Sequence, residues 1–219
     1  MIADERIVAY INSLDKGNTP FLNEIESEAL RTRVPIIRRE TQNLLKLMLE
    51  ISQPKHILEV GTATGFSALL MAEYAPENCR ITTIEKYEKR IPIARENIQR
   101  GQCEEKIELI EGDAADVLKS LADQKASKYD FIFMDAAKGQ YLNFLPDIMR
   151  LLTGGGILIS DNVLQDGDII ESRFAVTRRN RTIHARMRDY LYELMSSEEL
   201  TTSILPMGDG ITISVKKQN

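Results

Sequence analysis

The sequence predicts an α/β domain in which a largely parallel, seven-stranded sheet is covered by helices on both faces. Short apolar runs alternate with helical patterns from residue 56 onward, which is typical of parallel strands joined by helices. Two strand-like runs near the end of the chain are separated only by a short link containing proline and glycine. The first 52 residues have helical patterns. We therefore expect a single domain over 1–219, with a helical addition at 1–52 and an α/β core at 53–219.

The individual elements are predicted from hydrophobic spacing. In the helical addition, an amphipathic helix contains Ile7, Tyr10, Ile11 and Leu14, and two more helices are expected at 22–33 and 39–51. Five strands are expected at 56–60, 80–85, 106–111, 129–135 and 156–160. Helices should lie between them at 66–75, 88–100, 114–122 and 140–152. A helix at 180–196 then precedes strands at 201–205 and 211–215, and the short link 206–210 makes this last pair antiparallel.

The composition excludes several protein classes. The 43% apolar and 28% charged content argues against a disordered or fibrous chain. No run approaches the roughly 18 apolar residues that a membrane span requires, and the N-terminus lacks a signal-peptide pattern. Two cysteines, Cys79 and Cys103, suit reduced thiols, so we expect a cytoplasmic protein. The formal charge of −5 alone argues against a nucleic-acid partner, but the distribution of charge decides partners more directly.

A glycine-containing loop follows the first predicted strand, where Glu59-Val-Gly61-Thr-Ala-Thr-Gly65-Phe-Ser67 leads into a helix. Glycines at this sheet edge let the backbone approach a ligand closely. The G-x-x-x-G spacing differs from the G-x-G-x-x-G that holds a pyrophosphate, which favours a ligand without phosphates. Glu85 ends the second strand, where a carboxylate can accept both hydroxyls of a ribose. The alternative is a tight turn beside a solvated glutamate.

Oxygen-bearing side chains also end the fourth and fifth strands. Asp135 ends one strand, and Asp161-Asn162 ends the next. Adjacent strand ends lie about 5 Å apart, so these side chains offer three oxygen donors around one point. Such donors suit Mg²⁺ or Ca²⁺ rather than zinc, and neither histidine is placed to join them. The alternatives are helix-capping aspartates and a surface position for the nearby Lys138.

These motifs resemble those of the class I S-adenosylmethionine-dependent methyltransferases, whose fold is Rossmann-like. The run D-A-A-K-G-Q-Y with a later D-N is similar to the cation-dependent O-methyltransferases of the catechol and caffeoyl-CoA type. The resemblance implies that Glu85 holds the ribose, that the Gly61 loop faces the methionine part, and that Asp113 and Ala114 border the adenine. The residues implied to bind the cofactor are Ile37, Glu59, Gly61, Thr62, Ser67, Glu85, Asp113, Ala114 and Asp135.

The same resemblance implies a mechanism. A divalent cation, Mg²⁺ or another such as Ca²⁺ or Mn²⁺, would be held by Asp135, Asp161 and Asn162. It would chelate two neighbouring substrate oxygens and stabilise an oxyanion. Lys138 is the candidate base, because a nearby cation favours loss of its proton, and Asp135 is the second catalytic residue. The oxyanion would attack the sulfonium methyl in line.

A basic stretch precedes and enters the last long helix. It contains no acidic residue and six arginines, namely Arg173, Arg178, Arg179, Arg181, Arg186 and Arg188. A second basic group contains Arg31, Arg33, Arg38 and Arg39. Clustered arginines suit phosphate and nucleic acid. The alternative is a solvated helix face with ion pairs to the abundant acids.

The R-R-N-R run and the later P-M-G-D-G-I look like those of the bacterial tRNA 5-hydroxyuridine methyltransferases. This resemblance implies 5-methoxyuridine formation at the wobble position, with Arg178, Arg179 and Arg181 holding the anticodon stem-loop. 5-Hydroxyuridine carries a hydroxyl beside a carbonyl, as a catechol carries two hydroxyls. Two alternatives remain: a small catechol-like phenol or caffeoyl-CoA-like substrate, and a non-catalytic RNA-binding module. Members of the family are commonly dimeric, so we expect a homodimer with no membrane partner.

Overall fold

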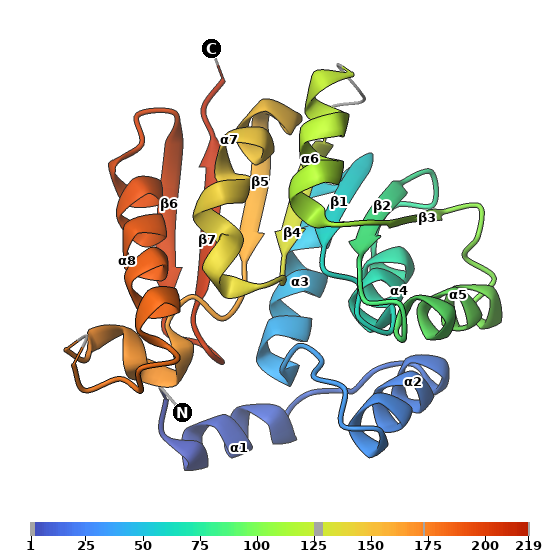
Figure 1. Ribbon diagram of the computed structural model, residues 1–219. Helices are drawn as coiled ribbons and strands as arrows, with labels where there is room; N and C mark the ends of the chain where they lie inside the picture. The colour runs from blue at the N-terminus through green and yellow to red at the C-terminus, as the bar shows by residue number, and fades with distance from the viewer. Residues whose placement is uncertain (1–2, 125–128, 173, 219) are drawn as a thin grey trace.

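Seven strands form one sheet in the order β3-β2-β1-β4-β5-β7-β6 (Figure 1). The structure is a computed structural model that describes residues 3–124, 129–172 and 174–218. The strands are β1 His56–Val60, β2 Arg80–Glu85, β3 Ile107–Glu111, β4 Tyr129–Met134, β5 Leu152–Ser160, β6 Leu200–Leu205 and β7 Ile211–Lys216. The helices are α1 Glu5–Ser13, α2 Pro20–Arg31, α3 Arg39–Ser52, α4 Phe66–Tyr74, α5 Ile91–Arg100, α6 Ala114–Asp123, α7 Tyr141–Leu151 and α8 Arg181–Ser196. Two short 3-10 helices, η1 Lys138–Gln140 and η2 Gln165–Ile170, complete the described elements.

The strand directions confirm the predicted fold class. Strands β1 to β5 pair in parallel, and β7 is antiparallel to both of its neighbours, β5 and β6. The chain first builds outward from β1 to β3 and then continues on the other side with β4 and β5. The strand order therefore reverses between β1 and β4, and ligands bind outside the carboxyl ends of such strands.

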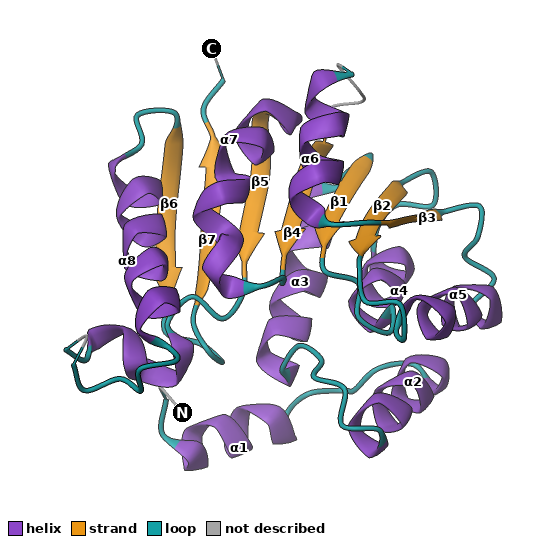
Figure 2. Cartoon of the chain, in the orientation of Figure 1, coloured by secondary structure: helices purple, strands orange, loops and turns teal. Residues whose placement is uncertain are grey.

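Alternation along the strands builds two apolar cores. Ile57, Phe131 and Phe133 pack on one face with side chains from α2, α3 and α4. Leu58 and Ile132 point to the other face and pack with α6, α7 and α8. The cartoon shows these three helices in front of the sheet and α3 behind it (Figure 2). Since successive side chains of a strand point to opposite faces, a strand buried on both sides must be apolar at nearly every position.

Some boundaries differ from the predicted ones for local reasons. Helix α2 begins at Pro20, because the Thr19 hydroxyl accepts a hydrogen bond from the Leu22 N–H and proline suits a first helical turn. Strand β5 begins at Leu152 rather than at residue 156, since the glycines at 154–156 continue the strand. Strand β4 ends at Met134, so Asp135 is the first residue beyond it. The two 3-10 helices were not predicted.

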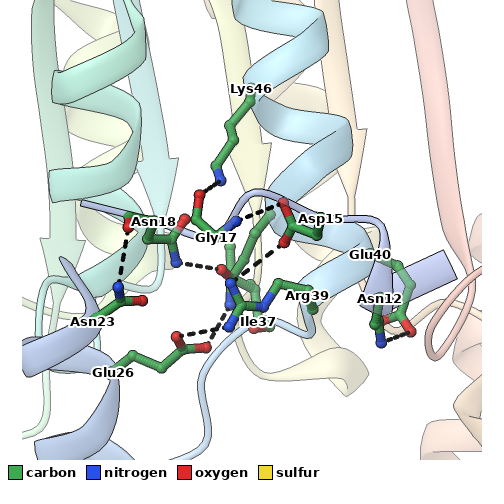
Figure 3. A network of polar contacts seen from close by, with 11 residues as sticks. Asn12, Asp15, Gly17, Asn18, Asn23, Glu26, Ile37, Arg39, Glu40 and Lys46 are labelled. Atoms are coloured by element: carbon green, nitrogen blue, oxygen red, sulfur yellow. Dashed lines mark hydrogen bonds and ion pairs between the residues drawn. The ribbon is translucent and has the colours of Figure 1, made fainter. Parts of the chain in front are cut away.

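Within the helical addition, polar contacts join α3 to α2 and to the segment between α1 and α2 (Figure 3). Arg39 lies 3.4 Å from the Asp15 carboxylate and 3.5 Å from that of Glu26. The buried Gln42 amide donates to Glu26 at 2.9 Å and to the Ile37 carbonyl at 3.1 Å. These contacts fix the 34–38 segment, which crosses from α2 to α3. Helix α1 has no buried residue.

No helix in the described ranges combines the length and the apolarity needed to cross a bilayer. Cys79 is buried and Cys103 partly buried, and both are free thiols. Burial raises the pKa of both thiols, so they remain protonated and poorly nucleophilic.

Candidate functional site

A cavity of about 700 Å³ lies at the carboxyl ends of the parallel strands. Its walls come from the loops after β1, β2, β3, β4 and β5 and from the 35–38 segment before α3. Eleven residues predicted for the site line it: Ile37, Gly61, Thr62, Ser67, Glu85, Asp113, Ala114, Asp135, Lys138, Asp161 and Asn162. The sheet therefore gathers the cofactor, catalytic and metal residues of the prediction around one space.

Gly61 lies where the strand order reverses, and only glycine fits there. Its φ is +107°, and a Cβ at this position would lie 2.2 Å from the Asp135 carbonyl oxygen. The N–H groups of Gly61 and Thr62 both donate to the Ile84 carbonyl at 3.1 Å. The loop after β1 is thus held against β2 and against the segment after β4, with its backbone open to the cavity.

The sequence predicts that Glu59 binds the cofactor. In the structure, Glu59 lies behind the loop after β1 and does not line the cavity. Its side chain is fully buried and accepts hydrogen bonds from the hydroxyls of Ser67 and Thr83. Burial raises the pKa of Glu59 to about 7. Ser67 lines the cavity, as does Thr62, whose hydroxyl is hydrogen-bonded to that of Thr83. Glu59 is therefore placed to position the loop rather than to touch a ligand.

The Glu85 carboxylate is held in one orientation at the end of β2. It accepts hydrogen bonds from the N–H groups of Ala63 at 2.8 Å, Lys86 at 2.9 Å and Tyr87 at 2.8 Å. A carboxylate has about four acceptor positions, so one is left for a ligand hydroxyl. Asp113 caps α6 by accepting from the Ala115 N–H at 2.9 Å, and Ala114 follows it on the cavity wall.

Asp135 and Asp161 lie at neighbouring strand ends because the sheet hydrogen bonding continues one residue beyond β4 and β5. The Asp135 N–H donates to the Val60 carbonyl, and the Asp161 N–H to the Met134 carbonyl, each at 3.0 Å. Burial raises the pKa of both carboxyls, and the charge of Asp135 raises the pKa of Asp161 further. Asp161 is buried and Asp135 is partly buried, and two such carboxylates at neighbouring strand ends form a site that a cation would stabilise.

Tyr141 joins the two strand ends. Its buried hydroxyl lies 3.2 Å from the Met134 carbonyl oxygen and 3.1 Å from that of Asp161. The tyrosine of the D-A-A-K-G-Q-Y run therefore sets the spacing of Asp135 and Asp161. Tyr190 of α8 packs edge-on against it, with ring centroids 5.5 Å apart.

The donor set fits a hard divalent cation. Asn162 donates its amide N–H to Asp209 at 3.0 Å, which leaves the amide oxygen available beside the two aspartates. In the described part of the chain, no three His, Cys, Asp or Glu side chains are grouped to hold a metal, so the candidate set is two carboxylates and one amide. Mg²⁺ is commonly held by one or two carboxylates, with waters and substrate completing the shell. His56 and His184 do not line the cavity.

The cavity residues that were not predicted as site residues include Arg38, Asp209 and Gln140. Arg38 forms ion pairs with Asp209 and, at 2.9 Å, with Asp166. The N–H groups of Val163 and Leu164 donate to the carbonyls of the 209–210 loop at 3.0 and 2.9 Å. Asp209 belongs to the P-M-G-D-G run, and the need of Asn162 for a supporting acceptor is the signal that could have identified it.

Among the described residues, the arginines of the basic stretch do not line the cavity. Arg178 and Arg179 are exposed in the turn before α8, and Arg181 opens that helix. Within the ranges that the structure describes, none of these three forms an ion pair. Arg173 lies outside the described residues. The N-terminal half of α8 packs beside η1, which carries Lys138, and the Arg186 guanidinium donates to the Gly139 carbonyl at 3.0 Å.

Comparison with known proteins identifies the family. The family model described as O-methyltransferase matches residues 12–217. A catechol O-methyltransferase of Niastella koreensis is 30% identical, over 77% of this chain and 70% of its own. A caffeoyl-CoA O-methyltransferase of Populus trichocarpa is 32% identical over the same shares.

The solved structures agree with this assignment. The SAH-bound methyltransferase PaMTH1 of Podospora anserina has 28% identity and a TM-score of 0.86, over 98% of this chain and 95% of its own. An SAH complex of an O-methyltransferase from Bacillus cereus has 25% identity and a TM-score of 0.85, over 97% of each chain. This chain therefore belongs to the O-methyltransferase family, as a class I enzyme that depends on S-adenosylmethionine.

Proposed function

We propose that this protein is a divalent-metal-dependent O-methyltransferase that acts on tRNA. It transfers a methyl group from S-adenosylmethionine to the 5-hydroxyl of 5-hydroxyuridine at the wobble position, giving 5-methoxyuridine. The hydroxyl and the neighbouring C4 carbonyl of this base form a vicinal oxygen pair, which suits a site with two neighbouring aspartates and a lysine.

The chain's own residues have distinct roles in this reaction. A divalent cation held by Asp135, Asp161 and Asn162 would stabilise the oxyanion of the substrate hydroxyl. Lys138 accepts the hydroxyl proton on its Nζ. Loss of that proton converts the hydroxyl into the nucleophile that forms the new C–O bond as the C–S bond breaks.

The cofactor side of the cavity positions the methyl group. Glu85 accepts a hydrogen bond from a ribose hydroxyl at its remaining acceptor position, and Asp113 and Ala114 lie beside the adenine. Gly61, Thr62, Ser67 and Ile37 enclose the methionine part. Holding the methyl group in line with the oxyanion provides much of the rate enhancement.

The observation that carries the choice of tRNA is a set of arginines near η1 that form no ion pair with any residue the structure describes. Arg178, Arg179 and Arg181 project positive charge from an acidic protein next to the helix that carries Lys138. Arginine forks bind phosphate well, and an unpaired anticodon base can enter a cavity without disrupting a duplex.

A second candidate substrate is a small catechol-like phenol or a caffeoyl-CoA-like thioester. The names of the relatives favour it, since catechol and caffeoyl-CoA enzymes match over 77% of the chain. The same metal site and base would serve this reaction, and only the role of the arginines would change.

Nucleoside mass spectrometry of tRNA from a strain lacking the gene distinguishes the two substrates. We expect 5-hydroxyuridine to accumulate and 5-methoxyuridine to disappear, with restoration by the wild-type gene but not by one encoding Asp161→Ala. An unchanged nucleoside profile would support the small-molecule substrate instead.

We also propose that the protein is a homodimer in which the apolar face of α1 contacts the second copy. Ile7, Tyr10, Ile11 and Leu14 are each more than half exposed. Isolated helices shorter than about 12 residues are marginal in water, so a nine-residue helix with no buried side chain gains stability when it is covered. Light scattering after size exclusion should give a dimer mass, and Ile11→Asp should give a monomer. A monomeric wild-type protein would exclude this interface.

A further inference from the structure

An exposed aromatic ring lies at the start of the arginine group. Phe174 is 80% exposed, more than any other aromatic side chain among the described residues. A phenyl ring has no polar atom, so its exposure to water is not offset by a hydrogen bond. Covering it with a flat apolar surface would be favourable.

The ring is held in a defined position by Arg181. The guanidinium carbon lies 5.7 Å from the ring centroid, within the range of a cation–π contact. The same guanidinium donates to the carbonyls of Phe174 at 3.5 Å and Val176 at 3.4 Å. Val176 is buried and anchors the turn. Phe174 is therefore presented by a fixed turn, with most of its surface open.

The charge around the ring suits a polyanion. No acidic residue occurs between Ser172 and Arg188. Arg178 and Arg179 are exposed on the next turn and have no ion-pair partner within the described ranges. An aromatic face flanked by arginines is the arrangement on which unpaired RNA bases stack while their phosphates are neutralised.

The start of α8 links Phe174 to the segment that carries Lys138. Arg181 opens α8, and Ile183 in the same turn faces Gly139, where a Cβ would lie 3.5 Å from the Ile183 Cγ1 atom. Gly139 directly follows Lys138, which lines the cavity. A nucleotide on Phe174 would thus neighbour the one whose base enters the cavity.

We propose that Phe174 is a stacking platform for an unpaired RNA base beside the methylated nucleotide, with Arg178 and Arg179 on the adjoining phosphates. This inference rests on tRNA being the substrate. It assigns base stacking to a residue outside the cavity and so explains how a single-stranded loop is held while one of its bases is methylated.

The absence of tryptophan from the chain provides a direct test. Phe174→Trp makes the indole at the platform the only one in the protein. Adding an anticodon stem-loop RNA should quench its fluorescence in a saturable way, because a stacked base quenches an indole. The matched control is Tyr192→Trp, which is 74% exposed on α8 but about 16 Å along the helix from Arg181. Its fluorescence should not change.

Two further probes distinguish base stacking from charge attraction and from membrane binding. An RNA duplex without unpaired bases should bind weakly and leave the indole unquenched, and equal quenching by this duplex would mean charge attraction without stacking. Phosphatidylserine vesicles should not shift the emission. A blue shift with vesicles and no response to the stem-loop would assign the surface to a membrane and overturn the proposal.

Kinetics separate this inference from the proposed function. Phe174→Ala should raise the KM for tRNA about tenfold, and it should lower kcat/KM for tRNA relative to kcat/KM for catechol. Phe174→Tyr should keep both quantities near their wild-type values. If Phe174→Ala methylates tRNA with the same KM as the wild-type protein, Phe174 is not a stacking platform, and tRNA remains the proposed substrate. If the wild-type protein methylates no tRNA, the proposed substrate fails, and quenching of Phe174→Trp by the stem-loop decides the platform independently.

Discussion

Two charged regions, the cavity and the start of α8, differ in how their charges are paired. In the cavity, Arg38 contacts Asp166 and Asp209, and Asp209 accepts from Asn162. At the start of α8, Arg178 and Arg179 are exposed and have no ion pair among the described residues. Paired charges hold a geometry, whereas unpaired arginines remain available to a phosphate. The difference suggests that the cavity supplies the chemistry and the α8 arginines supply substrate choice.

The largest effect should come from the cavity and should not depend on the substrate. Asp161→Ala removes a carboxylate proposed to hold the cation, and it should lower kcat/KM by about a thousandfold on tRNA and catechol alike. S-Adenosylmethionine affinity, measured by calorimetry, should change little. Asp168→Ala is the matched control, because this aspartate is exposed and does not line the cavity. Full wild-type activity in the presence of a chelator would contradict the metal assignment.

Removing the unpaired arginines should affect tRNA selectively. The triple change of Arg178, Arg179 and Arg181 to alanine should lower kcat/KM for tRNA by about a hundredfold at low salt. The slope of log affinity against log salt should flatten by about one for each phosphate that an arginine no longer neutralises. The ratio of tRNA to catechol turnover measures the selectivity.

A matched triple variant controls for net charge. Arg6, Arg95 and Arg150 are exposed and each already pairs with an acid, so their replacement removes the same charge elsewhere. This variant should keep most tRNA activity. An equal loss in the two triple variants would mean that overall charge, not the α8 group, attracts the RNA.

Arg38 lines the cavity, although in the sequence it stands among other arginines. Its replacement should therefore affect the reaction with both substrates. Arg38→Ala leaves Asp209 without its cation, and we expect about a tenfold loss of kcat/KM on both substrates with no change in salt dependence. Steady-state kinetics at two salt concentrations test this. A loss confined to tRNA would instead join Arg38 to the α8 group.

The sequence was sufficient to predict the sheet and eleven of the residues that line the cavity. Apolar strands separated by helices define a parallel sheet, and the ends of parallel strands must meet at one edge. Residues that directly follow strands, such as Gly61, Asp135 and Asp161, could therefore be assigned from strand positions alone. Their place in the cavity follows from the order and direction of the strands, and it does not depend on side-chain contacts between segments far apart in the chain.

Other features depend on contacts that strand positions do not specify. The pairing of Arg38 with Asp209 joins segments far apart in the chain, and the absence of ion pairs at Arg178 among the described residues depends on where the acids lie. Glu59 is different, because strand alternation puts it on the same face as Ile57, under the helices. Its position behind the loop could have been predicted from this alternation.

The smallest predicted effect concerns Glu59, whose carboxyl group is hydrogen-bonded to the hydroxyls of Ser67 and Thr83. Its pKa of about 7 when folded lies above the 4.5 of an ordinary glutamate, so folding takes up a proton between these pH values. The free energy of unfolding should therefore fall as pH rises from 4.5 to 7. Glu59→Gln keeps the shape, and the Ser67 and Thr83 hydroxyls can rotate to suit the amide. Urea denaturation at about pH 5 and about pH 8 should show a pH-dependent loss that is smaller by about 1–3 kcal/mol in the variant. An identical loss in both proteins would mean that Glu59 titrates normally and that the loop after β1 is not supported by a protonated carboxyl.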